Sequence, residues 1–210
     1  MKQLKNGQLV AIGAAVVLVI LAFFSFTVVS TTDNGVVTRL GKYNRTLQPG
    51  LQFIIPIVER VYHIPVTTVQ KEEFGFRTTM ASDRSQYRNN ILTESSMLTG
   101  DLNIINVEWT VQYRIIDPKA WLFNVEEGER INTVRDVSTA AINSLIGDRA
   151  IFDIMGSERD SIQFLAPEIM NEKYKQLGLG IAVSSVQLQN VIPPEDVQQA
   201  FEDVNIAIQD

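Results

Sequence analysis

An uncharged run of 21 residues, residues 9–29, constrains this chain more than any other feature. It reads LVAIGAAVVLVILAFFSFTVV, and only Ser25 and Thr27 carry polar side chains. A bilayer's hydrocarbon core of about 30 Å is crossed by about 20 helical residues, so the run predicts a transmembrane helix. The residues expected to anchor it are Leu9, Ile12, Val16, Leu18, Ile20, Leu21, Phe23, Phe24, Phe26 and Val29.

Two other structures could use such an apolar run. Lys2 and Lys5 resemble the basic start of a cleaved signal peptide, but the apolar part of a signal peptide is usually about 7–15 residues long. A helix buried in a soluble core is normally shorter and shows one polar face. The length of the run therefore favours a membrane anchor.

The charges beside the run predict its orientation. Lys2 and Lys5 precede it, and the first nine residues after it hold one charged side chain, Asp33. Because Lys and Arg mark the cytoplasmic side, residues 1–8 are predicted to be a short cytoplasmic N-terminus. The rest of the chain then lies outside the cytoplasmic membrane, although three basic residues within 39–45 weaken the asymmetry.

The composition excludes several kinds of function. The chain has 24 acidic residues against 18 Lys and Arg, a net charge of −6, and no basic stripe, which argues against nucleic-acid binding. It has no cysteine, so disulfides, thiol nucleophiles and thiolate metal sites are excluded. One histidine, His63, cannot build the usual histidine-rich zinc site within one chain. No catalytic, cofactor-binding or metal-binding residue is therefore predicted.

Residues 102–116 contain the clearest strand of the sequence. Apolar side chains occupy one face, namely Ile105, Val107, Trp109, Val111, Tyr113 and Ile115. Polar side chains occupy the other face, namely Asn106, Glu108, Thr110, Gln112 and Arg114. This alternation predicts a half-buried strand of an antiparallel sheet with Trp109 and Tyr113 in the core.

Shorter segments complete the expected sheet. Strands are predicted at residues 35–41, 51–55, 58–64, 66–70 and 181–191. The alternation of the last of these slips near Ser184 and Ser185, which predicts a β-bulge. Residues 42–50 and 76–90 are polar and lack a period, so both are expected to be loops.

Four helices are predicted after the long strand. The first is short and begins at Pro118 with Asp117 as its N-cap. The second covers residues 127–146, with Ile131 and Val134 on its apolar face, and ends at Gly147. The third covers residues 157–177. It opens with an imperfect capping box, Ser157 with Asp160, and should kink at Pro167. The order of elements predicts an α+β domain with helices packed on one face of an antiparallel sheet.

The fourth helix is expected within residues 193–210. Its apolar stripe consists of Val197, Ala200, Phe201, Val204 and Ile208. Nothing stops this helix before Asp210, which predicts a helix cut mid-course. The stripe could pack within its own domain or form a contact between protomers, and the sequence leaves both open.

Other polar groups do not form a recognisable catalytic motif. Serine pairs occur at residues 95–96 and 184–185, but neither has a partner motif for nucleophilic catalysis. The acidic residues at 126–129 could bind a divalent cation, yet acidic residues are also favoured at a helix N-terminus. His63 lies in an apolar run typical of a packed strand.

A set of collinear motifs resembles the SPFH (band 7) superfamily of stomatins, prohibitins and flotillins. The motifs are Gly35-Val36-Val37, Gly41-Lys42, Pro49-Gly50-Leu51, Gly75-Phe76-Arg77-Thr78, Met97-Leu98-Thr99-Gly100-Asp101, Val111-Gln112-Tyr113-Arg114-Ile115, Asp117-Pro118, Val186-Gln187-Leu188, Pro193-Pro194-Glu195 and Ala200-Phe201-Glu202-Asp203-Val204. Within the superfamily they are most similar to the HflK family. The resemblance implies an SPFH domain over residues 31–192.

The resemblance also implies a function. SPFH proteins are non-enzymatic and form large membrane-attached rings or cages. HflK-family proteins pair with an HflC-like partner around an FtsH-like membrane protease and limit the access of its substrates. Their SPFH domain lies on the periplasmic side of the inner membrane. The alternatives are a stomatin-like membrane organiser without a protease partner and a membrane-anchored hydrolase, for which the sequence offers no nucleophile with a base.

Overall fold

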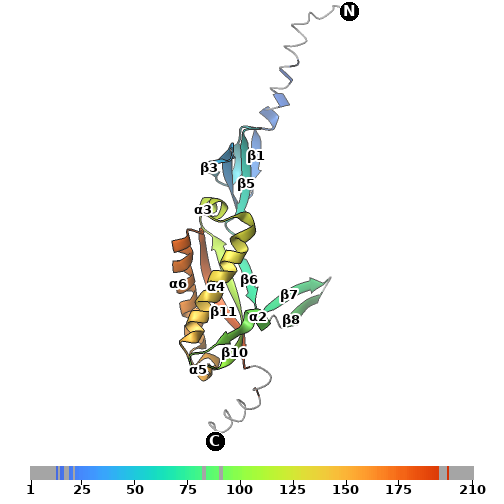
Figure 1. The fold of residues 1–210 in the computed structure, drawn as a ribbon. Helices are drawn as coiled ribbons and strands as arrows, with labels where there is room; N and C mark the ends of the chain where they lie inside the picture. Colours follow the sequence, from blue (N-terminus) through green and yellow to red (C-terminus); the bar gives the residue numbers. More distant parts are fainter. Residues whose placement is uncertain are drawn as a thin grey trace, which may run out of the picture. The chain divides into compact units, whose positions relative to one another are not determined.

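The chain forms two compact units, Met1–Thr68 and Val69–Asp210 (Figure 1). The structure, a computed structural model, describes residues 13, 15–16, 19–20, 22–81, 84–89, 92–193 and 198. Each unit has its own sheets and its own buried side chains, so each is described by itself.

The predicted anchor is only partly covered by the described residues. Among them, no helix is both long enough and apolar enough to cross a membrane. Val16, Ile20 and Phe23 are helical and Phe24 lies in a turn. The remaining predicted anchor residues before residue 22, namely Leu9, Ile12, Leu18 and Leu21, lie outside the described residues.

The prediction of a helix reaching residue 29 is wrong. Phe26–Val29 form strand β1, which pairs antiparallel with β4 (Gly50–Phe53). Three of its four residues are β-branched and favour an extended backbone. Val29 is 2% exposed and belongs to the core of the first unit, so it is a packed strand residue. Hydropathy alone could not separate the end of an anchor from the first strand of the domain.

A three-stranded antiparallel sheet in the order β3-β2-β5 completes the first unit. The strands are β2 (Asp33–Arg39), β3 (Lys42–Leu47) and β5 (Glu59–Pro65). The core consists of Val29, Val37 and Leu47, with Ile54 and Val61 packed against it.

Strand β3 replaces the loop predicted at residues 42–50. It is an edge strand and mostly exposed, so its polar sequence shows no apolar alternation. Leu40 and Gly41, with φ of 50° and 86°, form the two-residue turn that joins it to β2. Positive φ at both central positions is the geometry that suits a tight hairpin.

The second unit is built on an antiparallel sheet in the order β11-β10-β6, with β9 also paired to β10. Its strands are β6 (Gln70–Phe74), β9 (Ser96–Leu98), β10 (Ile104–Ile115) and β11 (Ile181–Ile192). The long predicted strand is confirmed, and Trp109 and Tyr113 are 0% and 1% exposed. The predicted bulge is confirmed too, because Gln112 pairs with Ser185 and Tyr113 with Val183.

Helices α4 and α6 cover one face of this sheet (Figure 1). The helices are α2 (Leu92–Ser95), α3 (Pro118–Phe123), the 3-10 turn η1 (Glu127–Glu129), α4 (Arg130–Gly147), α5 (Ile151–Met155) and α6 (Arg159–Leu177). An α+β fold with antiparallel sheets is therefore confirmed.

The predicted signals hold at some helix ends and fail at another, and α4 ends at Gly147 as predicted. The Asp117 carboxylate accepts the backbone N–H groups of Lys119 and Ala120, as an N-cap does. Gly178 ends α6 in the left-handed conformation, with φ of 63°. The predicted capping box at Ser157 is wrong, because α6 begins at Arg159 after Glu158, which makes no side-chain cap.

A β-hairpin replaces the loop predicted at residues 76–90. Strands β7 (Phe76–Ala81) and β8 (Arg84–Asn89) pair antiparallel, with Phe76 opposite Asn89 and Ala81 opposite Arg84. The prediction failed because backbone pairing gives no hydrophobic period when neither face of a ribbon is apolar.

Candidate functional site

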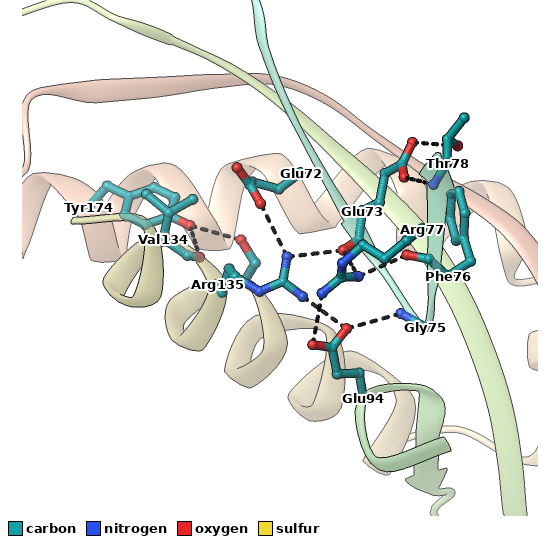
Figure 2. A network of polar contacts seen from close by, with 11 residues as sticks. Glu72, Glu73, Gly75, Phe76, Arg77, Thr78, Glu94, Val134, Arg135 and Tyr174 are labelled. Carbon is teal, nitrogen blue, oxygen red and sulfur yellow. Dashed lines mark hydrogen bonds and ion pairs between the residues drawn. The ribbon is translucent and has the colours of Figure 1, made fainter. Parts of the chain in front are cut away.

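A network of polar contacts in the second unit is centred on Arg135 of α4 (Figure 2). Its guanidinium donates to the Glu72 carboxylate at 3.1 Å and to the Glu94 carboxylate at 2.9 Å. It also donates to the backbone carbonyl of Glu73 at 3.0 Å. One side chain therefore joins α4, strand β6 and the short helix α2.

An aromatic stack lies beneath this guanidinium. The guanidinium carbon of Arg135 is 4.4 Å from the centre of the Phe74 ring. Phe74 in turn stacks on Trp109, its partner across strands β6 and β10, with ring centres 4.6 Å apart and planes 5° from parallel. A cation over an aromatic face is attracted by the ring quadrupole. Arg135 is thus fixed by two carboxylates and by a buried aromatic surface.

The same acidic groups fix the base of the β7–β8 hairpin (Figure 2). Arg77 donates to the Glu94 carboxylate at 2.9 Å and to the Glu73 carbonyl at 2.7 Å. The Glu73 carboxylate accepts the backbone N–H of Thr78 at 2.7 Å. Gly75 lies between β6 and β7 and has a φ of 78°. A Cβ there would lie 2.8 Å from the Ser95 side chain. The turn therefore requires glycine.

A second polar contact joins the two long helices. The Tyr174 hydroxyl of α6 donates to the Val134 carbonyl of α4 at 2.8 Å and lies 2.9 Å from the Ser138 hydroxyl. Burial raises the pKa of Tyr174 to about 12, so this phenol stays protonated. Its role is to satisfy polar groups inside the helix pair.

The first unit contains a different charged cluster, centred on Glu59 of β5. Its side chain is fully buried and accepts from Arg39 at 2.8 Å and from Arg45 at 3.0 Å. It also accepts from the side chain of Asn44 and the backbone N–H of Ile55. Burial alone would raise the pKa of Glu59, but the hydrogen bonds from the two arginines outweigh it and lower the pKa to about 2.

These arrangements position chain segments and keep their acids ionised. Burial opposes ionisation of Glu73 and Glu94, but hydrogen bonds, from Lys71 to Glu73 and from Arg77 to Glu94, hold both pKa values below the ordinary range. Acids of this kind are not poised to transfer a proton near neutral pH. Among the described residues, no group of three acidic or histidine side chains could hold a metal ion.

The candidate groups named from the sequence are scattered over the structure. His63 is an exposed residue of β5 opposite Gly35, and the Ser184 hydroxyl donates to the Gln112 carbonyl at 3.1 Å. Ser95 is buried at the end of α2, and the acidic residues at 126–129 surround η1. Residues of the predicted C-terminal stripe, Val197, Ala200, Phe201, Val204 and Ile208, lie outside the described residues.

Sequence reasoning missed the two charged clusters. Arg135 and Glu94 are 41 residues apart, and Glu59 and Arg39 are 20 apart, so no local motif joins them. One feature of the sequence could have indicated the Arg135 cluster. On α4, the charged Arg135 lies between the buried residues Val134 and Ser138. The predicted apolar face of α4 was slightly misplaced, since Ile131 is 41% exposed and Ser138 is fully buried.

Comparison with known families identifies the class of this protein. The chain belongs to the SPFH domain / Band 7 family, whose model matches residues 27–210. The predicted superfamily is therefore confirmed.

Particular relatives narrow this class. The chain is 65% identical over 200 residues to Protein HflK of Treponema pallidum, covering 95% of this chain and 61% of the relative. It is 41% identical over 203 residues to Protein HflK of Borreliella burgdorferi, covering 96% and 64%. It is 27% identical over 198 residues to Modulator of FtsH protease HflK of Escherichia coli, covering 94% and 42%. The chain thus spans about three fifths of the length of the first two of these relatives.

Proposed function

We propose that this chain is a membrane-anchored regulatory scaffold that assembles with an HflC-like SPFH partner and limits the access of substrates to an FtsH-like membrane protease. The name of the Escherichia coli relative, a modulator of FtsH protease, supports the regulatory role. The similarity to HflK proteins extends over nearly the whole chain, which supports a shared mode of action.

The observation that carries the proposal is the way charged groups are used in both units. Glu59 is engaged by two arginines, and Arg135 by two carboxylates and an aromatic ring. Such contacts fix the position of chain segments and offer no activated nucleophile. They favour a structural role for these charged groups over a catalytic one.

The proposed location is the inner membrane. The single anchor would end by Phe23, since Phe24 and Ser25 form a turn and β1 begins at Phe26. Lys2 and Lys5 favour a cytoplasmic N-terminus, and with one anchor the SPFH domain would then lie on the periplasmic side. In spheroplasts, added protease should then digest the domain, and digestion only in inverted vesicles would contradict this orientation.

Partner identity is tested by affinity purification of the tagged chain from native membranes in mild detergent. We expect a second SPFH chain and a membrane AAA protease to co-elute with it. A tagged version that starts at residue 26 serves as a control, because it retains β1 but lacks the proposed anchor. If the anchored chain recovers SPFH partners without any protease, it is a stomatin-like organiser and the protease role is wrong.

A further inference from the structure

Charge is divided unevenly between the two units. Of the chain's 18 Lys and Arg residues, six lie in the first unit, together with only two of its 24 Asp and Glu residues, namely Asp33 and Glu59. The whole chain has a net charge of −6, so the first unit is the basic part of an acidic protein. Such an asymmetry favours an anionic ligand for the first unit.

A pocket of about 250 Å³ lies at one end of the β3-β2-β5 sheet in this unit. The backbone N–H of Leu40 donates to the Val58 carbonyl at 3.1 Å, which joins the β2–β3 turn to the segment before β5 at the pocket. Ligand pockets usually enclose about 300–1,000 Å³, so this one has room for a small group only. Its lining includes Thr38, Leu40, Ile57, Val58, Arg60 and Tyr62.

Two polar side chains of β5 line the pocket from one face of the sheet. Val61 lies between Arg60 and Tyr62 and packs against the core of the unit. Because side chains alternate along a strand, Arg60 and Tyr62 both lie on the face opposite to that core. Thr38 of β2 is paired with Arg60. The pocket therefore combines a guanidinium with two hydroxyl groups.

Arg60 differs from its neighbouring arginines in having no counter-charge. Arg39 and Arg45 both bind the Glu59 carboxylate, whereas Arg60 makes no ion pair within the described part of the chain. A guanidinium presents a planar fork of N–H donors that matches the oxygens of a phosphate. Arg60 can thus bind an anionic group that enters the pocket.

The rim of the pocket is apolar and conformationally unusual. Leu40 and Ile57 are 84% and 89% exposed. Both have positive φ values, 50° and 73°, and a β-branched residue such as isoleucine rarely adopts this conformation. Strained backbone of this kind is concentrated at ligand-binding sites. A cationic pocket with an exposed aliphatic rim suits a ligand with an anionic head and an apolar tail.

We propose that this pocket binds the phosphate head group of an anionic phospholipid. Arg60 and Tyr62 donate to the phosphate oxygens, and the acyl chains contact Leu40 and Ile57. A free phosphate ion would leave this rim exposed to water, so the rim favours the lipid. The inference rests on the proposed membrane location and assigns a specific ligand to the first unit.

The test is a titration of the full chain, in neutral detergent, with phosphatidylglycerol, and bound lipid is counted by native mass spectrometry. Arg60→Gln removes a charge-assisted contact and should weaken binding about tenfold. Tyr62→Phe removes one hydroxyl and should weaken it about threefold. The matched control is Lys42→Gln, which removes the same charge from an exposed position of the same unit outside the pocket lining and should bind like wild type.

Two further ligands distinguish a lipid from a free anion. Phosphatidylcholine carries a compensating cation next to its phosphate and should bind more weakly than phosphatidylglycerol. Inorganic phosphate lacks the apolar tail and should not displace phosphatidylglycerol at equal concentration. Displacement by inorganic phosphate would overturn the assignment to a lipid, and equal losses for Arg60→Gln and Lys42→Gln would show general charge attraction without a site.

Ile57→Gly separates a role in binding from a role in folding. Glycine adopts positive φ without strain, so the substitution should slow hydrogen exchange in β5. It also removes the apolar rim, so phosphatidylglycerol should bind more weakly although the unit is more stable. Unchanged lipid binding by this variant would contradict the proposed contact with the acyl chains.

This inference and the proposed function fail separately. Lipid counting in detergent requires neither an SPFH partner nor a protease. Absence of phosphatidylglycerol binding overturns the lipid site while leaving co-elution with those partners intact. Conversely, a chain that recovers no protease can still bind the lipid through Arg60.

Discussion

Each unit contains a cluster of glutamate and arginine side chains, but a different type of residue is at its centre. In the first unit, one buried carboxylate, that of Glu59, collects Arg39 and Arg45. In the second unit, one guanidinium, that of Arg135, collects Glu72 and Glu94 and rests on an aromatic ring. The first cluster therefore depends on an acid that can be protonated, whereas the second is centred on a cation that cannot lose its charge.

The hydrophobic cores of the two units also differ, in the kind of side chain that they bury. The buried hydrophobic side chains described in the first unit are all aliphatic: Val29, Val36, Val37, Leu47 and Ile64. The second buries large aromatic residues such as Trp109, Phe74 and Tyr174. We infer that the first unit, with its smaller core, depends on its ion pairs for stability. In the second unit, with its larger core, the ion pairs mainly position chain segments. The predictions below test this contrast.

The largest effect is expected for Trp109→Ala. The side chain is fully buried against Phe74, so its removal should lower the free energy of unfolding by about 3–5 kcal/mol. Urea unfolding can be followed by the fluorescence of the remaining tryptophan, Trp121, which also lies in the second unit. A variant that unfolds like wild type would show that this aromatic core is not the main source of stability.

Glu59→Gln should destabilise the first unit by about 3 kcal/mol, because it leaves two arginines without their buried counter-charge. Hydrogen exchange read by mass spectrometry should show faster exchange in β2 and β5. Arg39→Gln serves as the graded control, since Arg39 is about half exposed and its loss should cost no more than about 1 kcal/mol. Equal effects of the two substitutions would mean that the carboxylate is not the centre of the cluster.

Acid should destabilise both units, because Glu59 in the first and Glu73 and Glu94 in the second have lowered pKa values, but the loss should be larger in the first unit, where the shift is large. The pKa of Glu59 falls from an ordinary value of 4.5 to about 2 in the folded chain, so its contribution is complete above pH 4.5. That contribution declines as the pH falls from 4.5 towards 2, because the unfolded chain then binds the proton more readily. The NMR signal of His63, the only histidine, reports on the first unit, and tryptophan fluorescence reports on the second. An equal loss of stability in the two units would contradict the contrast.

The smallest effect is expected for Arg135→Lys. Lysine keeps the charge but cannot reach both carboxylates and stack on Phe74 with a planar group, so the cost should be about 1–2 kcal/mol. Amide exchange should increase at the base of the β7–β8 hairpin, which Arg77 and Glu94 also hold. Arg114→Lys, at an exposed site, is the control. Unaltered exchange at the hairpin base would show that Arg135 does not position it.

Much of the fold could be predicted where an apolar pattern was long. The alternation along residues 104–115 identified β10, and the slip near Ser184 identified the bulge. The polar strands β3 and β7 could not be found, because their pairing partners, and not their own side-chain patterns, make them strands. The end of the anchor was misplaced for the opposite reason, since Val29 is apolar both in a membrane helix and in a strand.

The charged clusters could not be predicted from the sequence. Glu59 is surrounded by residues from three separate segments, and its pKa depends on contacts that only the folded sheet creates. The family could nevertheless be recognised, since its motifs are collinear along the chain. Several of these motifs lie within strands, as residues 111–115 do in β10, whereas Glu59, Glu94 and Arg135 lie outside all of them.

Reconstitution of a membrane protease in liposomes tests the central claim most directly. An FtsH-like protease is incorporated with an HflC-like partner, with and without this chain, and the degradation of a membrane-embedded substrate and of a soluble substrate is measured. The scaffold account predicts slower degradation of the membrane substrate when the chain is present, with the soluble substrate unaffected. Equal degradation of the membrane substrate with and without the chain, or proteolysis by the chain alone, would contradict the account.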